Sequence, residues 1–378
     1  MQNAIRLPNE RHVYGLDVLR CVAAVLVAGF HFTRKLDGMD QVFPFGWVGV
    51  EIFFLISGYV ISRSAQHGDA ARFLKSRFLR LYPAAWIVAL VSGTILAVVP
   101  SYYWRHAQIS VFPDLPHVLN SLLLTGMGMS ASYWTLAVEL AFYLCVFLLL
   151  LAGRAWWLRH FAIPLTLYAT PYIVALALHH LRITHTPFVE FGLSGWNALL
   201  LRHGPFFALG LFLCFAAGAG LRMREKCAAG LALLLCLMEI ACRAAEQLHG
   251  QAISDLVQLP WLIVEAETAF VVALVAMMVF LRRDVALPGR LRPLARSLGR
   301  ATYPFYLAHE ILGGLTIYWL LRLGAGPGAA VAGGFVMVLA VACFITERVE
   351  PAFRRIIRGI IARRGDRDAR PAANLGAA

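Results

Sequence analysis

Ten apolar segments, each close to the length that crosses a bilayer, constrain this chain more than any other feature of its sequence. A helix needs about 20 predominantly apolar residues to cross the hydrocarbon core. With 60% hydrophobic and 15% charged residues, the chain is too apolar for a soluble protein of 378 residues. We therefore predict an all-α integral membrane protein with about ten transmembrane helices. The predicted spans are residues 15–33, 46–64, 82–100, 131–152, 161–180, 196–218, 227–243, 259–281, 300–321 and 328–346.

The distribution of basic side chains predicts how these spans are oriented. Lys and Arg collect in the cytoplasmic loops of membrane proteins. If the N-terminus is cytoplasmic, 26 of the 34 Lys and Arg residues fall on the cytoplasmic side. This asymmetry predicts that both termini are cytoplasmic, and it explains the net charge of +13 without a nucleic-acid partner. A missed span would disturb the alternation, so the asymmetry also supports the count of ten.

The rest of the chain adds few features. The seven cysteines lie in or beside apolar runs without a C-x-x-C pair, which predicts packing residues, no disulfide framework and no metal site. The first span lacks a cleavage-site pattern, so we expect a transmembrane helix and not a cleaved signal peptide. Segment 101–130 is expected to hold a short re-entrant or interfacial helix. Residues 1–350 are predicted to form the transmembrane domain, and residues 351–378 a basic amphipathic and then disordered cytoplasmic tail.

Two ionisable residues on the first span are the first candidates for function. Arg20 and His31 are eleven residues apart, which places them on one helix face about 16 Å apart along the axis. Asp17, three residues before Arg20, shares this face and can neutralise it. Ionisable groups inside a membrane usually face a polar cavity or one another. In the alternative interpretation, Arg20 and His31 extend to opposite membrane surfaces.

Two carboxylates lie inside other predicted spans. Glu51 lies one turn into the second span, ahead of Ser57-Gly58-Tyr59, and Glu139 lies inside the fourth. Both carboxylates are expected to face the bundle interior. Glycines in the second span permit close helix approach, so packing accounts for Ser57 and Gly58 better than a nucleophilic role does.

Other polar residues cluster near the predicted membrane boundaries. Tyr133 and Trp134 precede the fourth span and are typical of an interfacial aromatic belt. Arg202 lies near the outer mouth of the sixth span, and His309 and Glu310 are buried in the ninth. A functional role for His309 and a hydrogen-bonded core histidine are both compatible with this position.

A basic group precedes Pro83 and the third predicted span. It comprises Arg72, Lys75, Arg77 and Arg80 in what we expect to be a cytoplasmic loop. The general enrichment of Lys and Arg in cytoplasmic loops explains such a group. Alternatively, it is an anion site in which arginine forks bind phosphate oxygens.

Five motifs in order resemble the acyltransferase-3 family of polytopic membrane acyltransferases, which are often O-acetyltransferases of bacterial cell-surface glycans. They are LDVLRCVAAVLVAGFHF, GVEIFFLISGYVIS, RFLKSRFLRLYP, SYWTLAVELAFYL and TYPFYLAHE. The resemblance covers about residues 15–145 and 297–310. It implies functional roles for Arg20 and His31, and acyl-coenzyme A binding by Arg77 and Arg80. Ser57-Gly58-Tyr59 departs mildly from the family's Ser-Gly-Phe pattern.

The resemblance implies a membrane O-acyltransferase in a bacterial inner membrane. Acetyl, or another short acyl group, would pass from cytosolic acetyl-CoA to a hydroxyl of a cell-surface glycan such as lipopolysaccharide or exopolysaccharide. His31 would act as general base or acyl carrier. The supporting residues expected are Arg20, Glu51 and Glu139 at the reacting centre, Arg77, Arg80, Arg72 and Lys75 at the donor, and Asp17, Ser57, Tyr133, Trp134, Arg202 and His309 at the substrate.

Two alternatives remain open at this point. In a transporter, Arg20, His31, Glu51 and Glu139 would line a solute or proton path, although the sequence has no convincing internal repeat. In the second alternative the enzyme is kept, but its acceptor is a small molecule such as an antibiotic sugar.

Overall fold

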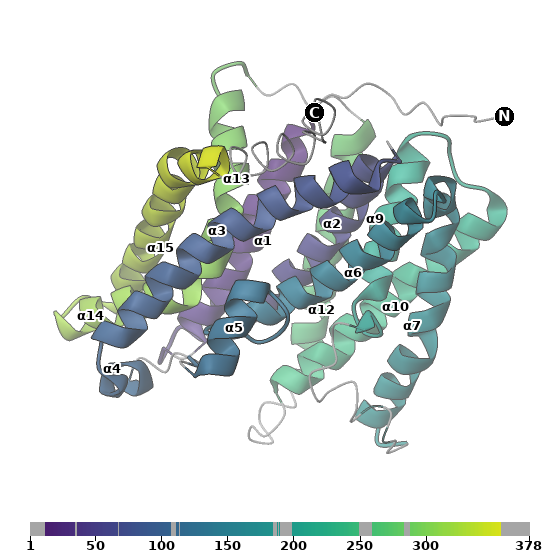
Figure 1. The fold of residues 1–378 in the computed structure, drawn as a ribbon. Helices are drawn as coiled ribbons and strands as arrows, with labels where there is room; N and C mark the ends of the chain where they lie inside the picture. Colours follow the sequence, from purple (N-terminus) through teal and green to yellow (C-terminus); the bar gives the residue numbers. More distant parts are fainter. Residues whose placement is uncertain are drawn as a thin grey trace, which may run out of the picture.

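The fold is a helical bundle (Figure 1). The computed structural model describes residues 12–34, 36–66, 68–106, 111–112, 114–183, 187, 189, 199–248, 259–282 and 288–356. Within these ranges there is no strand beyond an isolated bridge between Val111 and Ser130. The all-α class predicted from the apolar segments is therefore confirmed.

The longer helices follow the predicted segments closely. They are α1 (Tyr14–Thr33), α2 (Gly49–Ala65), α3 (Ala70–Val98), α6 (Trp134–Leu151), α7 (Leu158–His180), α9 (Gly204–Ala217), α10 (Met223–Gln247), α12 (Leu259–Arg282), α13 (Arg292–Ala308) and α15 (Pro327–Phe344). Shorter helices are α4 (Ser101–His106), α5 (Leu115–Leu123) and α14 (Gly314–Arg322). Segment 101–130 thus holds two short helices, where one was expected.

Eight helical segments in the described ranges are long and apolar enough to cross a membrane. The chain is therefore a multi-pass membrane protein. The sixth predicted span contains only the 14-residue α9 among its described residues. The ninth predicted span consists of α13 and α14 with a short π-helical stretch between them, and its helix begins at Arg292 rather than at residue 300. The count of ten spans and the sides on which the termini lie stay predictions.

The third span begins twelve residues earlier than predicted, and this is a correction. The basic group of residues 72–80 is not a loop, because α3 already starts at Ala70 and runs through Pro83. The Asp69 side chain accepts a hydrogen bond from the Arg72 backbone N–H and so caps the helix N-terminus. Hydropathy alone does not assign these first turns to the span, because they carry charged residues.

Close glycine contacts hold the centre of the bundle together. A Cβ atom at Gly58 of α2 would lie 2.2 Å from the Phe207 carbonyl oxygen of α9, and one at Gly210 of α9 would lie 2.2 Å from the Leu55 carbonyl oxygen. Each backbone therefore approaches the other where only glycine fits. The expectation that Gly58 serves close helix packing is confirmed.

Helix α1 packs between α2 and α13, and this places Asp17 against α13 and His31 against the stretch that follows it (Figure 1). Near its N-terminal end, Asp17 faces Gly299 of α13 so closely that a Cβ there would lie 2.5 Å from the Asp17 side chain. Near its C-terminal end, His31 faces Glu310, just beyond α13. The prediction that Arg20 and His31 share a helix face is consistent with this arrangement.

The chain leaves α13 through a π-helical stretch, His309–Gly313, before α14 begins. The extra residue in such a turn shifts the side chains that follow it, and π-helical turns occur frequently at functional sites. Here the stretch turns His309 and Glu310 toward α1, where both residues are buried.

Candidate active site

The candidate reacting centre is a histidine–carboxylate pair between α1 and the π-helical stretch. His31 Nδ1 lies 3.4 Å from Glu310 Oε1. The His31 side chain is 36% exposed, whereas that of Glu310 is 7% exposed. A histidine reachable from one side and oriented from the other by a buried carboxylate is suited to moving a proton.

The second carboxylate oxygen of Glu310 is held by the segment that precedes α6. Glu310 Oε2 accepts a hydrogen bond from the Ser130 hydroxyl and one of 3.0 Å from the Ser132 backbone N–H. The two serine hydroxyls are 2.7 Å apart. Donors on Oε2 leave Oε1 directed at His31, so this segment fixes the orientation of the pair.

His309 completes the group beside His31. Its Nδ1 donates to the Tyr306 backbone carbonyl oxygen at 2.5 Å, and its Nε2 is buried without a hydrogen-bond partner. The His31 and His309 ring centroids are 5.1 Å apart. One donor atom from each of His31, His309 and Glu310 lies within 4.8 Å of the others, a spacing that a metal ion could bridge.

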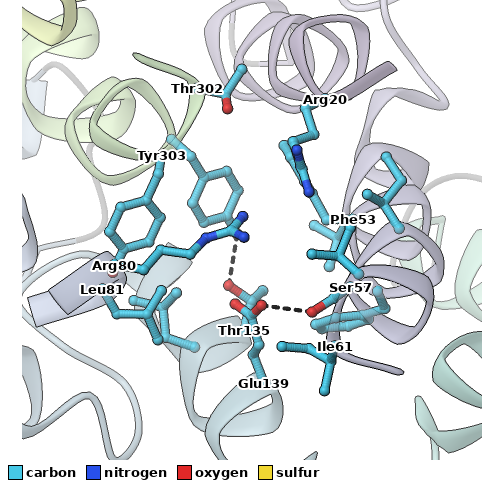
Figure 2. Close-up of a pocket in the computed structure, with 16 residues that line it drawn as sticks. Arg20, Phe53, Ser57, Ile61, Arg80, Leu81, Thr135, Glu139, Thr302 and Tyr303 are labelled. Atoms are coloured by element: carbon cyan, nitrogen blue, oxygen red, sulfur yellow. Dashed lines mark hydrogen bonds between the residues drawn. The ribbon is translucent and has the colours of Figure 1, made fainter. Parts of the chain in front are cut away.

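A cavity lies further along the same face of α1 (Figure 2). Arg20, Ser57, Arg80, Glu139 and Tyr303 are among the side chains that line it. Ser57 donates a hydrogen bond of 2.7 Å to Glu139 Oε1. Two guanidinium groups, one carboxylate and several hydroxyls thus share this cavity with apolar and aromatic side chains.

Two side chains at the wall of this cavity connect it to the Glu310 group. Thr135 and Tyr306 line the cavity, and their hydroxyls are 3.0 Å apart. Both hydroxyls also donate to the Ser132 carbonyl oxygen, at 2.9 and 3.3 Å. Because the Ser132 N–H binds Glu310, a single hydrogen-bond network runs from the cavity wall to the carboxylate beside His31.

A second, strongly basic cavity of about 650 Å³ adjoins the first. The two share Arg20, Arg80, Thr302 and Tyr303. Six arginines line the basic cavity, and they come from α1, α3, α13 and the residues that follow α15. They are Arg20, Arg80, Arg296, Arg300, Arg354 and Arg355.

Acidic side chains only partly neutralise this basic cavity. The Asp17 side chain is 6% exposed, and its carboxylate oxygens pair with Arg20 Nη1 at 3.3 Å and with His12 Nε2 at 2.5 Å. Glu350 pairs with Arg354. The remaining arginine charge gives the cavity an excess of positive charge, which suits it to a polyanion. The expected pairing of Asp17 with Arg20 is confirmed.

The four basic residues of the α3 motif are placed in different surroundings. Arg80 lines both cavities. Arg77 lies over the rings of Phe73 and Tyr143, at 5.7 and 5.9 Å from their centroids. Arg72 pairs with Asp69 on the exposed surface, and Lys75 is also exposed.

The carboxylates expected beside His31 lie elsewhere. Glu139 accepts hydrogen bonds from Ser57 and Tyr143 in the cavity. Glu51 is fully buried 3.5 Å from Arg243 Nη1. The carboxylate that contacts His31 is Glu310, which adjoins His309 in the last of the family motifs.

Two of the expected substrate residues, Arg202 and Trp134, lie at a separate group that includes His203 and Glu239. Arg202 is 6% exposed and pairs with Glu239 and Glu246 of α10 at 2.7 and 2.9 Å. The Trp134 ring lies 5.1 Å from the His203 ring. Tyr133 is 2% exposed, so it faces protein and does not form part of a lipid-facing belt. The short 3-10 turn Ala131–Tyr133 directs it inward.

Sequence reasoning missed the arginines of α13 and the residues after α15, which looked like loop and tail charges. It also missed Ser130 and Ser132, because no spacing rule pairs them with a residue about 180 positions later. For Glu310, one signal was available: an ionisable residue inside an apolar span is rarely without a role.

Comparison with known proteins identifies a family. Residues 13–347 match the family described as Acyltransferase domain. The chain is 29% identical over 153 residues to the Acyltransferase MdmB of Streptomyces mycarofaciens, covering 37% of this chain and 38% of the relative. It is 31% identical over 144 residues to the O-acetyl transferase of Shigella phage Sf6, covering 34% and 43%.

A further relative is the Putative membrane-bound transacylase BcsY of Komagataeibacter xylinus, 34% identical over 155 residues, which is 36% of each chain. The chain spans less than half the length of each of these three relatives. No solved structure matches it.

Proposed function

The chain belongs to the acyltransferase-3 family. From that premise we propose that it is an O-acyltransferase, which moves an acetyl or other short acyl group from cytosolic acyl-CoA to a glycan hydroxyl. The family match confirms the resemblance that was based on the five motifs. The observation that carries the proposal is the basic cavity at the Arg20 end of α1. It adjoins a second cavity whose wall is hydrogen-bonded to the segment that holds Glu310 beside His31. Membership in an acyltransferase family also favours this function over the transporter alternative.

The donor fits the basic cavity by charge and by shape. Coenzyme A carries a diphosphate and a further phosphate at one end and a neutral flexible arm with the thioester at the other. Arginine forks bind phosphate oxygens in bidentate geometry. We place the phosphates among Arg80, Arg296, Arg300 and Arg355, and the arm in the adjoining cavity past Arg20. The positive-inside distribution supports a cytoplasmic location for this mouth.

His31 is the group that we assign to the acceptor hydroxyl. With Nδ1 directed at Glu310, the other ring nitrogen, Nε2, takes the hydroxyl proton as the oxygen attacks the thioester carbonyl carbon. The carbon–sulfur bond then breaks, and the departing thiolate takes the proton back from His31. Glu310 stabilises the imidazolium that exists between the two proton transfers. In the alternative, His31 Nε2 attacks the thioester carbonyl carbon, the carbon–sulfur bond breaks and an acyl-histidine forms. The acceptor hydroxyl then attacks the acyl carbon, which releases the imidazole, and the hydroxyl proton passes to the thiolate.

The acceptor reaches His31 from the end of α1 opposite the basic cavity. The His31 side chain is exposed there, and the predicted topology makes this the outer side. A relative named O-acetyl transferase supports a hydroxyl acceptor. We propose a cell-surface glycan in a bacterial inner-membrane setting.

An arginine substitution tests the donor site. Arg300→Ala removes a cavity arginine, and we expect the KM for acetyl-CoA to rise about 10-fold, since a hydrogen bond to a charged group contributes about 1.5–3 kcal/mol. The matched control is Arg348→Ala, which removes an exposed arginine that does not line the cavity.

A truncated donor separates phosphate binding by Arg300 from a role of Arg300 in the fold. Acetyl-pantetheine lacks all the phosphates, so Arg300→Ala should change its KM no more than the control does. An equal rise in KM for acetyl-CoA and acetyl-pantetheine would show that Arg300 supports the fold and does not bind phosphate.

A further inference from the structure

A second cluster of ionisable groups lies between α2, α9 and α10, apart from the proposed reacting centre. Glu51 of α2, His203 at the N-terminus of α9 and Glu239 of α10 are each 0% exposed. One donor atom from each lies within 4.8 Å of the other two. Neither cavity described above includes any of the three.

The polar atoms of this cluster lack the partners that burial demands. Both carboxylate oxygens of Glu51, Oε2 of Glu239 and both ring nitrogens of His203 form no hydrogen bond. A buried polar group without a partner costs about 1–3 kcal/mol, and a charged one more. One donor atom from each of the three residues converges on a common space, and this indicates a group that the protein chain itself does not supply.

The charges around the cluster leave room for a cation. Glu51, Glu239 and Glu246 bring three carboxylates, whereas Arg202 and Arg243 bring two guanidinium groups. Arg202 is directed at Glu239 Oε1 and Glu246, so it does not reach Glu239 Oε2 within hydrogen-bond distance. Arg243 is 3.5 Å from Glu51 and also lies over the Trp47 and Trp134 rings, at 5.6 and 5.2 Å.

We propose that Glu51, His203 and Glu239 bind a divalent transition metal, with zinc as the best match. Two carboxylates and one imidazole are a ligand set that zinc accepts, and the imidazole disfavours magnesium and calcium. In a tetrahedral site with bonds of about 2.0–2.2 Å, donor atoms lie about 3.4 Å apart. The three side chains therefore need to close by at most about 1.4 Å from their present spacing.

The ion would tie three helices together on the outer side of the bundle in the predicted topology. Helix α2 packs against α9 through Gly58 and Gly210, and α10 also packs against α9. The ion would add a direct link between α2 and α10 beside the Glu51–Arg243 pair. Trp134, whose ring lies 5.1 Å from the His203 ring, connects the site to the start of α6. The site would thus stabilise the wall that carries Thr135 and the cavity beyond it.

Metal content of the full-length protein in detergent tests this proposal directly. After loading with Zn²⁺ and removal of free metal, the native protein should retain about one zinc per chain. His203→Gln should lose it, and this variant breaks no hydrogen bond or ion pair of the described structure. The control is His160→Gln, a partly buried histidine on α7 outside the cluster, which should retain the metal.

Cobalt gives a second readout that does not depend on activity. Co²⁺ in a site with one nitrogen and two carboxylate ligands should show visible d–d absorption bands in the native and His160→Gln proteins and not in His203→Gln. Zinc should also raise the melting temperature of the native protein, because an ion that binds only the folded state stabilises it.

Two results would overturn the proposal. The first is a native protein that retains no zinc while it elutes as a monodisperse species. The second is equal zinc retention by the native and His203→Gln proteins, which would place the ion elsewhere, such as at His31, His309 and Glu310.

Discussion

At the scale of single residues, the orientation of His31 depends on a carboxylate that is itself fixed from both sides. Ser130 and the Ser132 N–H hold one oxygen of Glu310, and His31 faces the other. Arrangements of this kind orient a base without requiring the carboxylate to touch substrate. Glu310 is therefore a positioning residue, and His31 is the residue that would contact the reacting atoms.

A charge-neutral substitution separates these roles. Glu310→Gln keeps the size of the side chain and an acceptor for Ser130 but removes the charge beside His31. We expect kcat to fall about 10- to 100-fold, part of the range that general acid–base catalysis contributes, while the KM for acetyl-CoA stays within about twofold. Steady-state kinetics with purified protein measures both constants.

A second substitution and a contrary result define the limits of the positioning role of Glu310. Ser130→Ala removes one of two donors to Glu310 and should reduce kcat less than Glu310→Gln does. If Glu310→Gln raises KM and leaves kcat unchanged, the carboxylate serves donor binding and the positioning role is wrong.

Residue spacing predicted one half of the site better than the other. Arg20, Asp17 and His31 share one helix, so a rise of 1.5 Å and a turn of 100° per residue were enough to place them on one face. Glu310, Ser130 and the arginines of α13 reach the site through tertiary packing between distant segments. No local rule predicts such pairs, because the register of one helix against another depends on side-chain packing.

At the scale of the elements, hydropathy predicted where most helices lie but not where α3 begins. The first turns of α3 carry Arg72, Lys75 and Arg77, so their hydropathy is that of a loop although their backbone is helical. The π-helical stretch at His309 could not be read from the sequence either, because it follows from the way α13 packs against α1.

The contact between α2 and α9 predicts how the bundle responds to a single methyl group. Gly210→Ala would place a Cβ 2.2 Å from the Leu55 carbonyl oxygen, and backbone cannot yield as a flexible side chain does. We expect a loss of about 1–3 kcal/mol of stability, visible as a lower melting temperature in detergent. Gly230→Ala on α10, where a Cβ meets nothing within 4 Å, is the control and should be neutral or slightly stabilising. Equal melting temperatures for the two variants would contradict this packing.

At the scale of the whole molecule, transfer from a cytosolic donor to an outer acceptor requires a donor opening and an acceptor opening on opposite membrane faces. Eight membrane-capable helices make the protein multi-pass, and the distribution of Lys and Arg predicts which face is cytoplasmic. The basic cavity and the exposed face of His31 lie toward opposite ends of α1, as this requires.

Cysteine labelling in intact cells tests this topology. Gly289 and Gly326 are exposed with open space around them, on predicted cytoplasmic and outer sides respectively. A membrane-impermeant thiol reagent should label Gly326→Cys in intact cells and Gly289→Cys only after permeabilisation, each measured against the unsubstituted protein. Labelling of Gly289→Cys in intact cells would reverse the predicted orientation.

The central claim is that His31 performs the transfer of an acyl group from a donor bound in the arginine-lined cavity. The most direct measurement is thiol release from acetyl-CoA by the native protein and by His31→Gln, alongside acetyl-CoA binding to both in detergent. We predict that His31→Gln binds acetyl-CoA as tightly as the native protein does but releases thiol at least about 10²-fold more slowly. Thiol release by His31→Gln at the native rate would contradict the claim.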